Sequence, residues 1–259
     1  MDKPSRSEKT QPGNPHELTI RQHVYPAKSI GRFVGAGGVD LLDWKNGKRR
    51  KARPNDSMFC ADRAWSHGAE QGFMKQIEDC FQQLTDDVLA EGQFRTSPAR
   101  QHTITEFFAL WGTRAHRRQL ASQTLETSGT PRVAYTRDEL ENLEKNNIIG
   151  FRADGSIAAR DIAAPVIRLN IDRVVADMAG HSWGLLTASE GEFCVPDAPH
   201  RPIVPITPTL AFMLNGLSGP VTGRFVSLLN AAQRQWAKDY VFARDLSACP
   251  GIDLAVHGD

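Results

Sequence analysis

Apolar residues recur at helical spacing in the longest patterned stretch of the chain, residues 67–91. The spacing of this stripe is four, four, three and four residues, which keeps it on one face of an α-helix. Its members are Phe73, Ile77, Phe81, Leu84 and Val88. Gly92 follows where a glycine commonly ends a helix. The pattern predicts one continuous helix over residues 67–91.

Four further stretches carry helix signals. Ser97 and Pro98 form a cap followed by a proline, which predicts a helix to about residue 125. Thr136 and Glu139 match a capping box that opens a shorter helix, and another is predicted over residues 165–178. Thr222 opens the last helix. We expect this helix to turn inward the residues Phe225, Leu229, Ala232, Trp236 and Tyr240.

The remaining pattern predicts short strands. Residues 39–44 and 48–53 flank Asn46 and Gly47, a dipeptide typical of a type I′ hairpin turn. Residues 183–187 and 192–195 are expected to pair with each other, and residues 203–206 add a strand. The predicted fold class is α+β, a predominantly helical single domain with a small antiparallel sheet or hairpins.

The polar ends of the chain delimit this domain. Residues 1–19 contain little to bury and are expected to form a disordered N-terminal tail. Residues 20–245 are expected to form one globular domain, and residues 246–259 a loose C-terminal tail. No internal repeat or linker divides the chain.

Composition and charge place the chain among ordinary globular proteins. It has 259 residues with 31 Lys and Arg against 30 Asp and Glu, so no overall charge favours nucleic acid. The four cysteines are widely spaced and form no CxxC pair, as expected for free thiols in a reducing compartment. No signal peptide or bilayer-spanning run is evident. We therefore expect a cytoplasmic protein with no membrane partner.

The familiar catalytic motifs are missing from the sequence. There is no phosphate-binding GxxxxGK[ST] loop, no GxGxxG after a strand, no HExxH and no GxSxG. The glycine-rich stretch 35–38 is followed by no helix pattern that would present its N-terminus to a phosphate. A plain loop is the better interpretation of that stretch.

Short motifs spread over residues 21–244 resemble a known family. Residues 23–33 begin with His23 and Pro26 and end on Phe33; a helix with Glu70 and Glu78 follows, and the later matches lie at residues 107–114, 193–199, 205–208 and at Asn230. This order resembles the mostly bacterial family called domain of unknown function 4238. The chain departs from the family pattern at Ala27, Trp111 and Pro196. The resemblance implies positions rather than a reaction.

Glu70 is the most informative of these positions. On a regular helix it lies near the centre of the apolar stripe, with Glu78 about 80° away. A carboxylate aimed at a core costs several kcal/mol unless it is paired, bound to metal or protonated. The structural candidates for its partner are Arg114 and the exposed amides of the helix's own first turn. The alternative is a magnesium or manganese ion shared by Glu70, Glu78 and Asp197 with His23, because oxygen ligands plus one imidazole suit such ions.

The other candidates each allow a structural and a functional role. His23 is a candidate general base or ligand, or a histidine hydrogen-bonded at the core edge. Arg114 is a candidate phosphate clamp, or the buried partner of Glu70. Asp197, just before Ala198 and Pro199, either starts a turn or contributes to a site on a loop.

The basic residues of the hairpin suggest a partner. The cluster contains Lys48, Arg49, Arg50 and Lys51. It is either a solvated face or a surface that follows a nucleic-acid backbone. No aromatic residue is interleaved with these charges, so base stacking there is not indicated.

Two hypotheses about function follow. In the first, the protein is a metal-dependent phosphodiesterase or nuclease-like effector, with His23 and Arg114 as catalytic residues and Glu70, Glu78 and Asp197 as metal ligands. In the second, it is a non-catalytic module that binds nucleic acid or protein, and its buried polar residues are structural. The position of the carboxylates in space distinguishes the two.

Overall fold

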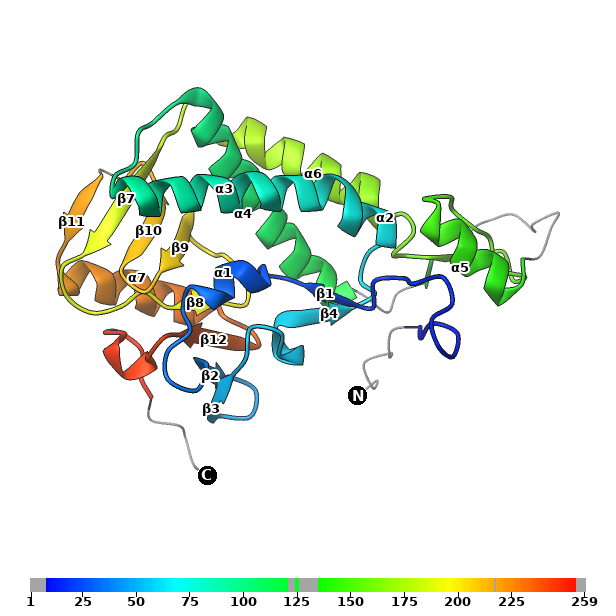
Figure 1. Cartoon of the computed structure of the whole chain (residues 1–259), viewed down its shortest axis with the longest axis horizontal. Helices are drawn as coiled ribbons and strands as arrows, with labels where there is room; N and C mark the ends of the chain where they lie inside the picture. The colour runs from blue at the N-terminus through cyan, green and yellow to red at the C-terminus, as the bar shows by residue number, and fades with distance from the viewer. Residues whose placement is uncertain (1–7, 121–123, 126–134, 217, 255–259) are drawn as a thin grey trace.

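The computed structural model describes residues 8–120, 124–125, 135–216 and 218–254 of the chain (Figure 1). Within these residues the helices are α1 (Ala27–Gly31), α2 (His67–Ala69), α3 (Lys75–Glu91), α4 (Pro98–Leu120), α5 (Arg137–Lys145), α6 (Ala163–Asp177) and α7 (Gly223–Trp236). The strands are β1 (Arg21–His23), β2 (Val39–Asp43), β3 (Lys48–Ala52), β4 (Cys60–Asp62), β5 (Thr124–Leu125), β6 (Ile157–Ala158), β7 (Trp183–Ala188), β8 (Val195–Pro196), β9 (Ile203–Thr207), β10 (Leu210–Leu214), β11 (Gly219–Val221) and β12 (Tyr240–Ala243).

Two four-stranded sheets form the β part of the fold. One has the order β3-β2-β12-β8 and is antiparallel, and the other has the order β11-β7-β10-β9 with β11 parallel to β7. Strand pairs β1-β4 and β5-β6 lie outside these sheets. With 41% helix and 20% strand, the fold is mixed α+β. The prediction of a predominantly helical domain with a small sheet was therefore wrong.

The physical reason for this error is burial on both faces of the strands. Every residue of β12 is buried, so this strand lacks the alternation of apolar and polar residues that identifies a half-buried strand. Tyr240, which begins β12, was assigned to the last helix. The strand pair predicted around residues 189–191 was also wrong, because β7 pairs with β10 and β11 instead.

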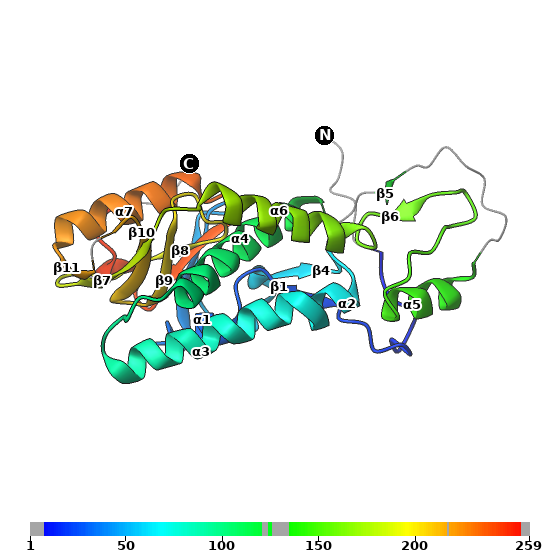
Figure 2. The same cartoon turned by 90° about the horizontal axis from the view of Figure 1, so that it is seen from above.

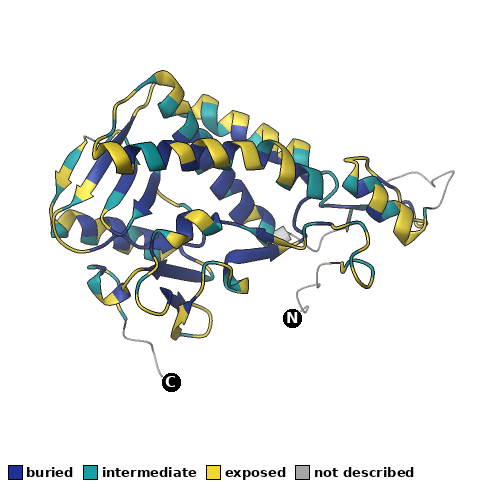
Figure 3. Cartoon of the chain, in the orientation of Figure 1, coloured by how far each residue is buried: buried dark blue, intermediate teal, exposed yellow. Residues whose placement is uncertain are grey.

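A helical layer packs against the sheets. Helix α4 contacts both α3 and α6 and lies between them (Figure 2). Phe81 of α3 stacks on Phe107 of α4 at a centroid distance of 3.6 Å, and Phe81 also meets Phe212 of β10 edge-on. These rings belong to the main core, which Figure 3 shows as the dark interior between the helices and the sheets. No helix in the described residues is long and apolar enough to cross a bilayer.

Helix α7 covers the other face of the β7 sheet with a different set of residues than expected. Val226, Leu229, Asn230 and Gln233 are buried, while Phe225 and Trp236 are exposed. The predicted inward face was therefore wrong for these two aromatic residues. Thr222 does cap the helix, as predicted, by accepting a hydrogen bond from the Phe225 amide.

An arm, residues 136–161, projects beyond α2 at one end of the molecule (Figure 1). Its helix α5 begins with the predicted capping box of Thr136 and Glu139. Residues 8–19, which we call the N-terminal strap, are tied to the arm. The Gln11 amide donates to Glu141 at 2.7 Å, and His16 Nε2 lies 2.8 Å from Asp138 Oδ1.

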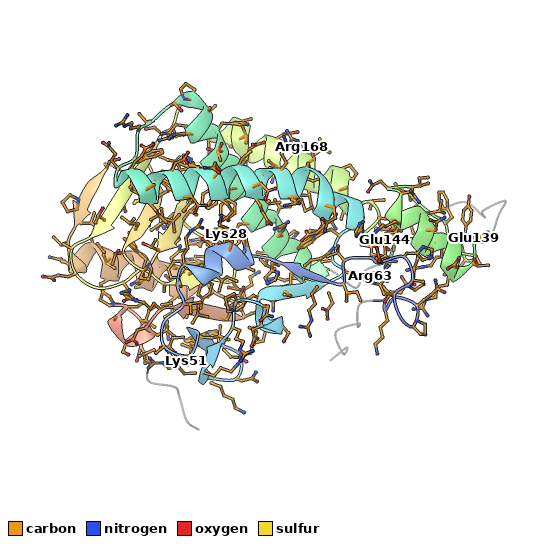
Figure 4. The ribbon with its side chains drawn as sticks, in the orientation of Figure 1. Lys28, Lys51, Arg63, Glu139, Glu144 and Arg168 are labelled. Atoms are coloured by element: carbon orange, nitrogen blue, oxygen red, sulfur yellow. The ribbon has the colours of Figure 1, made fainter. Side chains whose placement is uncertain are left out.

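Buried ion pairs fasten the arm to the body. Arg63 and Glu144 lie together at the base of the arm and form an ion pair, with each side chain 2% exposed (Figure 4). Arg160 donates to the same Glu144 carboxylate at 3.0 Å and to Glu8 of the strap at 2.8 Å. The prediction of a disordered tail over residues 1–19 was therefore wrong for residues 8–19, which are packed against the arm. Residues 1–7 lie outside the described residues.

The end of the chain is packed as well. Leu246 and Cys249 are buried against Val241 of β12, and the Leu246 amide donates to Asp40 of β2 at 3.0 Å. Residues 246–254, expected to be a loose tail, therefore cover one face of the β2 sheet as far as Leu254. Residues 255–259 lie outside the described residues.

Candidate functional site

The helix predicted over residues 67–91 is interrupted where it carries Glu70. Ser66 caps its first turn by accepting a hydrogen bond from the Ala69 amide. A π-helical segment, Glu70–Met74, follows, and within it Gly72 has non-helical angles of φ −95° and ψ −121°. Such π segments are frequent at functional positions in helices. The prediction of one continuous helix was wrong at this point.

The interruption changes which residues share a face. In a regular helix Glu70 and Glu78 would be about 80° apart. A π segment accommodates one extra residue, which takes up about 100° of helical rotation. Glu70 and Glu78 both face α4, where each contacts Arg114.

Arg114 of α4 bridges these two carboxylates. Its Nη2 donates to Glu70 Oε2 at 3.0 Å, and its Nη1 donates to Glu78 Oε1. The Arg114 side chain is 1% exposed, against 16% for Glu70 and 22% for Glu78. A buried guanidinium requires a counter-charge, and the two glutamates supply it. The ion-pair cluster of Glu70, Glu78 and Arg114 thus brings together three of the five predicted site residues.

Trp65 completes this cluster. Its indole Nε1 donates to Glu70 Oε2 at 2.6 Å, and its ring lies 5.3 Å from the Arg114 guanidinium carbon in cation–π geometry. Glu70 Oε2 therefore accepts two hydrogen bonds, which fix its orientation. The sequence did not indicate Trp65, because its contact with Glu70 depends on the path of the chain through the Ser66 cap.

Asp197 holds a turn at a separate place. Its Oδ1 accepts from the Lys238 amide at 3.0 Å and its Oδ2 from the Asp239 amide at 3.1 Å. Burial raises the pKa of Asp197, and the two backbone hydrogen bonds oppose that shift. Asp239 in turn lies 3.7 Å from Arg118, one helical turn after Arg114. Both oxygens of Asp197 thus serve the connection between α7 and β12.

His23 contacts neither Glu70 nor Glu78. It lies opposite Cys60 in the β1-β4 pair, and its Nε2 is 3.1 Å from the Pro54 carbonyl oxygen. Burial raises the pKa of the Cys60 thiol to about 11, which keeps that neighbour protonated and uncharged near neutral pH. This hydrogen bond agrees with the structural alternative for His23, a histidine hydrogen-bonded at the edge of the core.

A metal centre of Glu70, Glu78 and Asp197 would require all three carboxylates to face one ion. Glu70 and Glu78 instead face Arg114, and Asp197 faces backbone amides. Among the residues that the structure describes, no three His, Cys, Asp or Glu side chains are grouped so as to hold a metal ion. As arranged, these carboxylates do not fit a shared magnesium or manganese ion.

The basic hairpin is balanced by acids. Arg49 pairs with Asp40 of the facing strand, and Arg50 donates to Asp56 at 2.7 and 2.8 Å. The strand register places Asp40 opposite Lys51, with 3.9 Å between the charged atoms. Opposite charges across a strand pair stabilise the pairing. Of the four basic residues, Lys48 alone has no acidic partner within the described part of the chain.

Comparison with protein families, curated proteins and solved structures found no match to this chain. The resemblance to the domain of unknown function 4238 family therefore stays a prediction that rests on its short motifs.

Proposed function

We propose that this chain is a non-catalytic protein-binding module that captures an acidic amphipathic helix on the outer face of α7. The proposal places it in the cytoplasm, which its four free thiols support. The pairing of Glu70 and Glu78 with Arg114 supports a structural role for the polar residues that we considered as catalytic.

The observation that carries the proposal is a row of exposed apolar side chains on α7. Phe225, Leu228 and Trp236 are 36%, 62% and 53% exposed, and Leu228 lies on the side of the helix opposite the buried Val226. Their spacing of three and eight residues keeps them on one helical stripe. Large apolar side chains gathered on an exposed face are typical of a surface that binds another protein.

The charge of this face selects the partner. Helix α7 contains no acidic residue, and the exposed Arg224 lies beside Leu228 on its outer side. His200 stacks on Trp236 with 3.9 Å between ring centroids, and Arg201 follows it in the chain. A second copy of α7 would bring like charges together, whereas an acidic helix would pair with them. Helices that bind in this way use apolar anchors at intervals of three and four residues.

A peptide-binding experiment tests the proposal. The probe is a fluorescent 14-residue helix, as long as α7, with leucine on one stripe and glutamate elsewhere. Its control carries lysine in place of glutamate. We expect saturable anisotropy with the acidic probe and at least about tenfold weaker binding of the basic one.

Matched variants locate the binding surface. Leu228→Ser should weaken binding of the acidic probe about tenfold, because burying a leucine side chain is worth about 1.5–3 kcal/mol. Leu169→Ser is the control, since Leu169 is 67% exposed and belongs to α6, a different helix. Equal effects of the two variants would refute the proposal. Binding to anionic vesicles without binding to the peptide, or self-association abolished by Leu228→Ser, would refute it too.

A further inference from the structure

A cavity of about 370 Å³ lies between α4 and α6. Phe108 and Ala109 of α4, Val174 of α6 and Pro199 form its apolar wall. Pro199 belongs to the turn that Asp197 anchors, so the hydrogen bonds of Asp197 also position this wall. The volume lies toward the lower end of the range for small-molecule sites, roughly 300–1,000 Å³.

Polar groups from both helices line the rest of the cavity. His116 follows Ala109 by two helical turns on α4, and Asn170 and Arg173 lie one turn apart on α6. Gly112 lies between these groups, where a Cβ atom would come within 3.5 Å of the Pro199 ring. The two helices thus direct an imidazole, an amide and a guanidinium toward one apolar space.

The charge of the lining is positive. No acidic side chain lines the cavity, and within the described residues the side chains of His116, Asn170 and Arg173 have no hydrogen-bond or ion-pair partner. His116 and Arg173 are exposed at its mouth. Asp172, which adjoins Arg173 in the chain, pairs with Arg168 at 3.0 Å. A guanidinium with no partner beside an apolar wall matches a ligand that is anionic at one end and apolar at the other.

We propose that the cavity between α4 and α6 binds a small organic carboxylate, with Arg173 on the carboxylate and the apolar wall on the ligand body. Arg173 offers two parallel N–H groups, which suit the two oxygens of a carboxylate. Asn170 and His116 supply further polar contacts. None of the lining residues belongs to the α7 stripe, although Pro199 adjoins His200, which stacks on Trp236. Arg173 and the benzoate test therefore probe this site separately from binding to α7.

Titration of the full chain with benzoate tests this site. Amide resonances of Gly112, Thr113 and Val174 should shift and saturate in the millimolar range. Benzamide has the same shape without the charge and should bind at least about fivefold more weakly, because a hydrogen bond to a charged group is about twice as strong. Benzylamine, which is a cation, should not bind.

Two variants and a second anion separate the possible outcomes. Arg173→Gln should weaken benzoate binding about tenfold. Arg168→Gln on the same helix should leave binding unchanged, because Arg168 lies outside the cavity lining. The absence of saturable shifts, or equal affinity of the Arg173→Gln protein, would overturn the proposal. Phosphate binding as tightly as benzoate would overturn the assignment of a carboxylate with an apolar body.

Discussion

Replacing Glu70 and Glu78 with glutamine, singly and together, tests whether the two carboxylates serve as counter-charges for Arg114. Each single change keeps the shape and one acceptor oxygen but turns an ion pair into a hydrogen bond between the Arg114 cation and a neutral acceptor. The typical difference between these bonds is about 1 kcal/mol. The side chains are 16% and 22% exposed, which keeps the cost near that value. Each single variant should therefore lose about 1 kcal/mol of unfolding free energy.

The double variant should lose more than the sum of the two. With both charges removed, the Arg114 guanidinium is 1% exposed and has no counter-charge in the cluster. An uncompensated buried charge costs about 3–5 kcal/mol. Two independent single losses would add to about 2 kcal/mol, so the double variant should lose about 1–3 kcal/mol more unfolding free energy than their sum. A double-mutant cycle resolves a coupling energy of that size. The assay is urea unfolding at neutral pH of the parent and the three variants.

Adding divalent metal to the same series distinguishes this role from that of a metal ligand. If the glutamates pair with Arg114, the losses should be equal with and without millimolar MgCl2 or MnCl2. If they hold an ion, metal should stabilise the parent by mass action, and Glu70→Gln should abolish that effect. A metal-dependent loss would refute the structural role and favour the phosphodiesterase hypothesis. Additive losses would refute the shared pairing.

Three other changes probe the core, the arm and the hairpin. Phe81→Ala should cost about 3–5 kcal/mol in urea unfolding, because the ring is fully buried and stacked on Phe107. Burial raises the pKa of Asp161 to about 6, so the free energy of unfolding should fall as pH rises from about 4 to 6. Asp161→Asn should flatten that fall and add about 3 kcal/mol at pH 7. Arg49→Gln should cost about 1–3 kcal/mol and leave binding to duplex DNA unchanged, because Arg49 neutralises the buried Asp40.

The parts of the fold that the sequence predicted have local causes. The caps at Thr136 and Thr222 and the hairpin that joins β2 to β3 depend on neighbouring residues alone. The pairing of β12 with β2 depends on residues about 200 positions apart, and no periodic pattern identifies it. The prediction of a two-residue type I′ turn was also wrong. The hairpin strands end at Asp43 and resume at Lys48, so the loop has four residues rather than two.

The sequence predicted which residues form the candidate site, but it did not predict how they are arranged. The helical wheel indicated that Glu70 points toward the core and needs a partner. Arg114 was one candidate, and Glu70 does pair with Arg114. Placing Glu78 on the same guanidinium requires the π segment, and the sequence signals that segment only by Gly72. The role of Asp197 depends on the amides of residues 238 and 239, which no motif connects to it.

The hydrogen bond between Gln11 of the N-terminal strap and Glu141 of the arm cannot form until late in synthesis of the chain. Gln11 and its acceptor Glu141 are 130 residues apart, so the strap leaves the ribosome long before the arm exists. At a synthesis rate of about 5–20 residues per second, that delay is about 7–26 s. During it, Arg63 and Glu8 are exposed to water without Glu144 and Arg160. Closure of the arm is therefore a late event, and until it occurs the strap is accessible to chaperones and proteases.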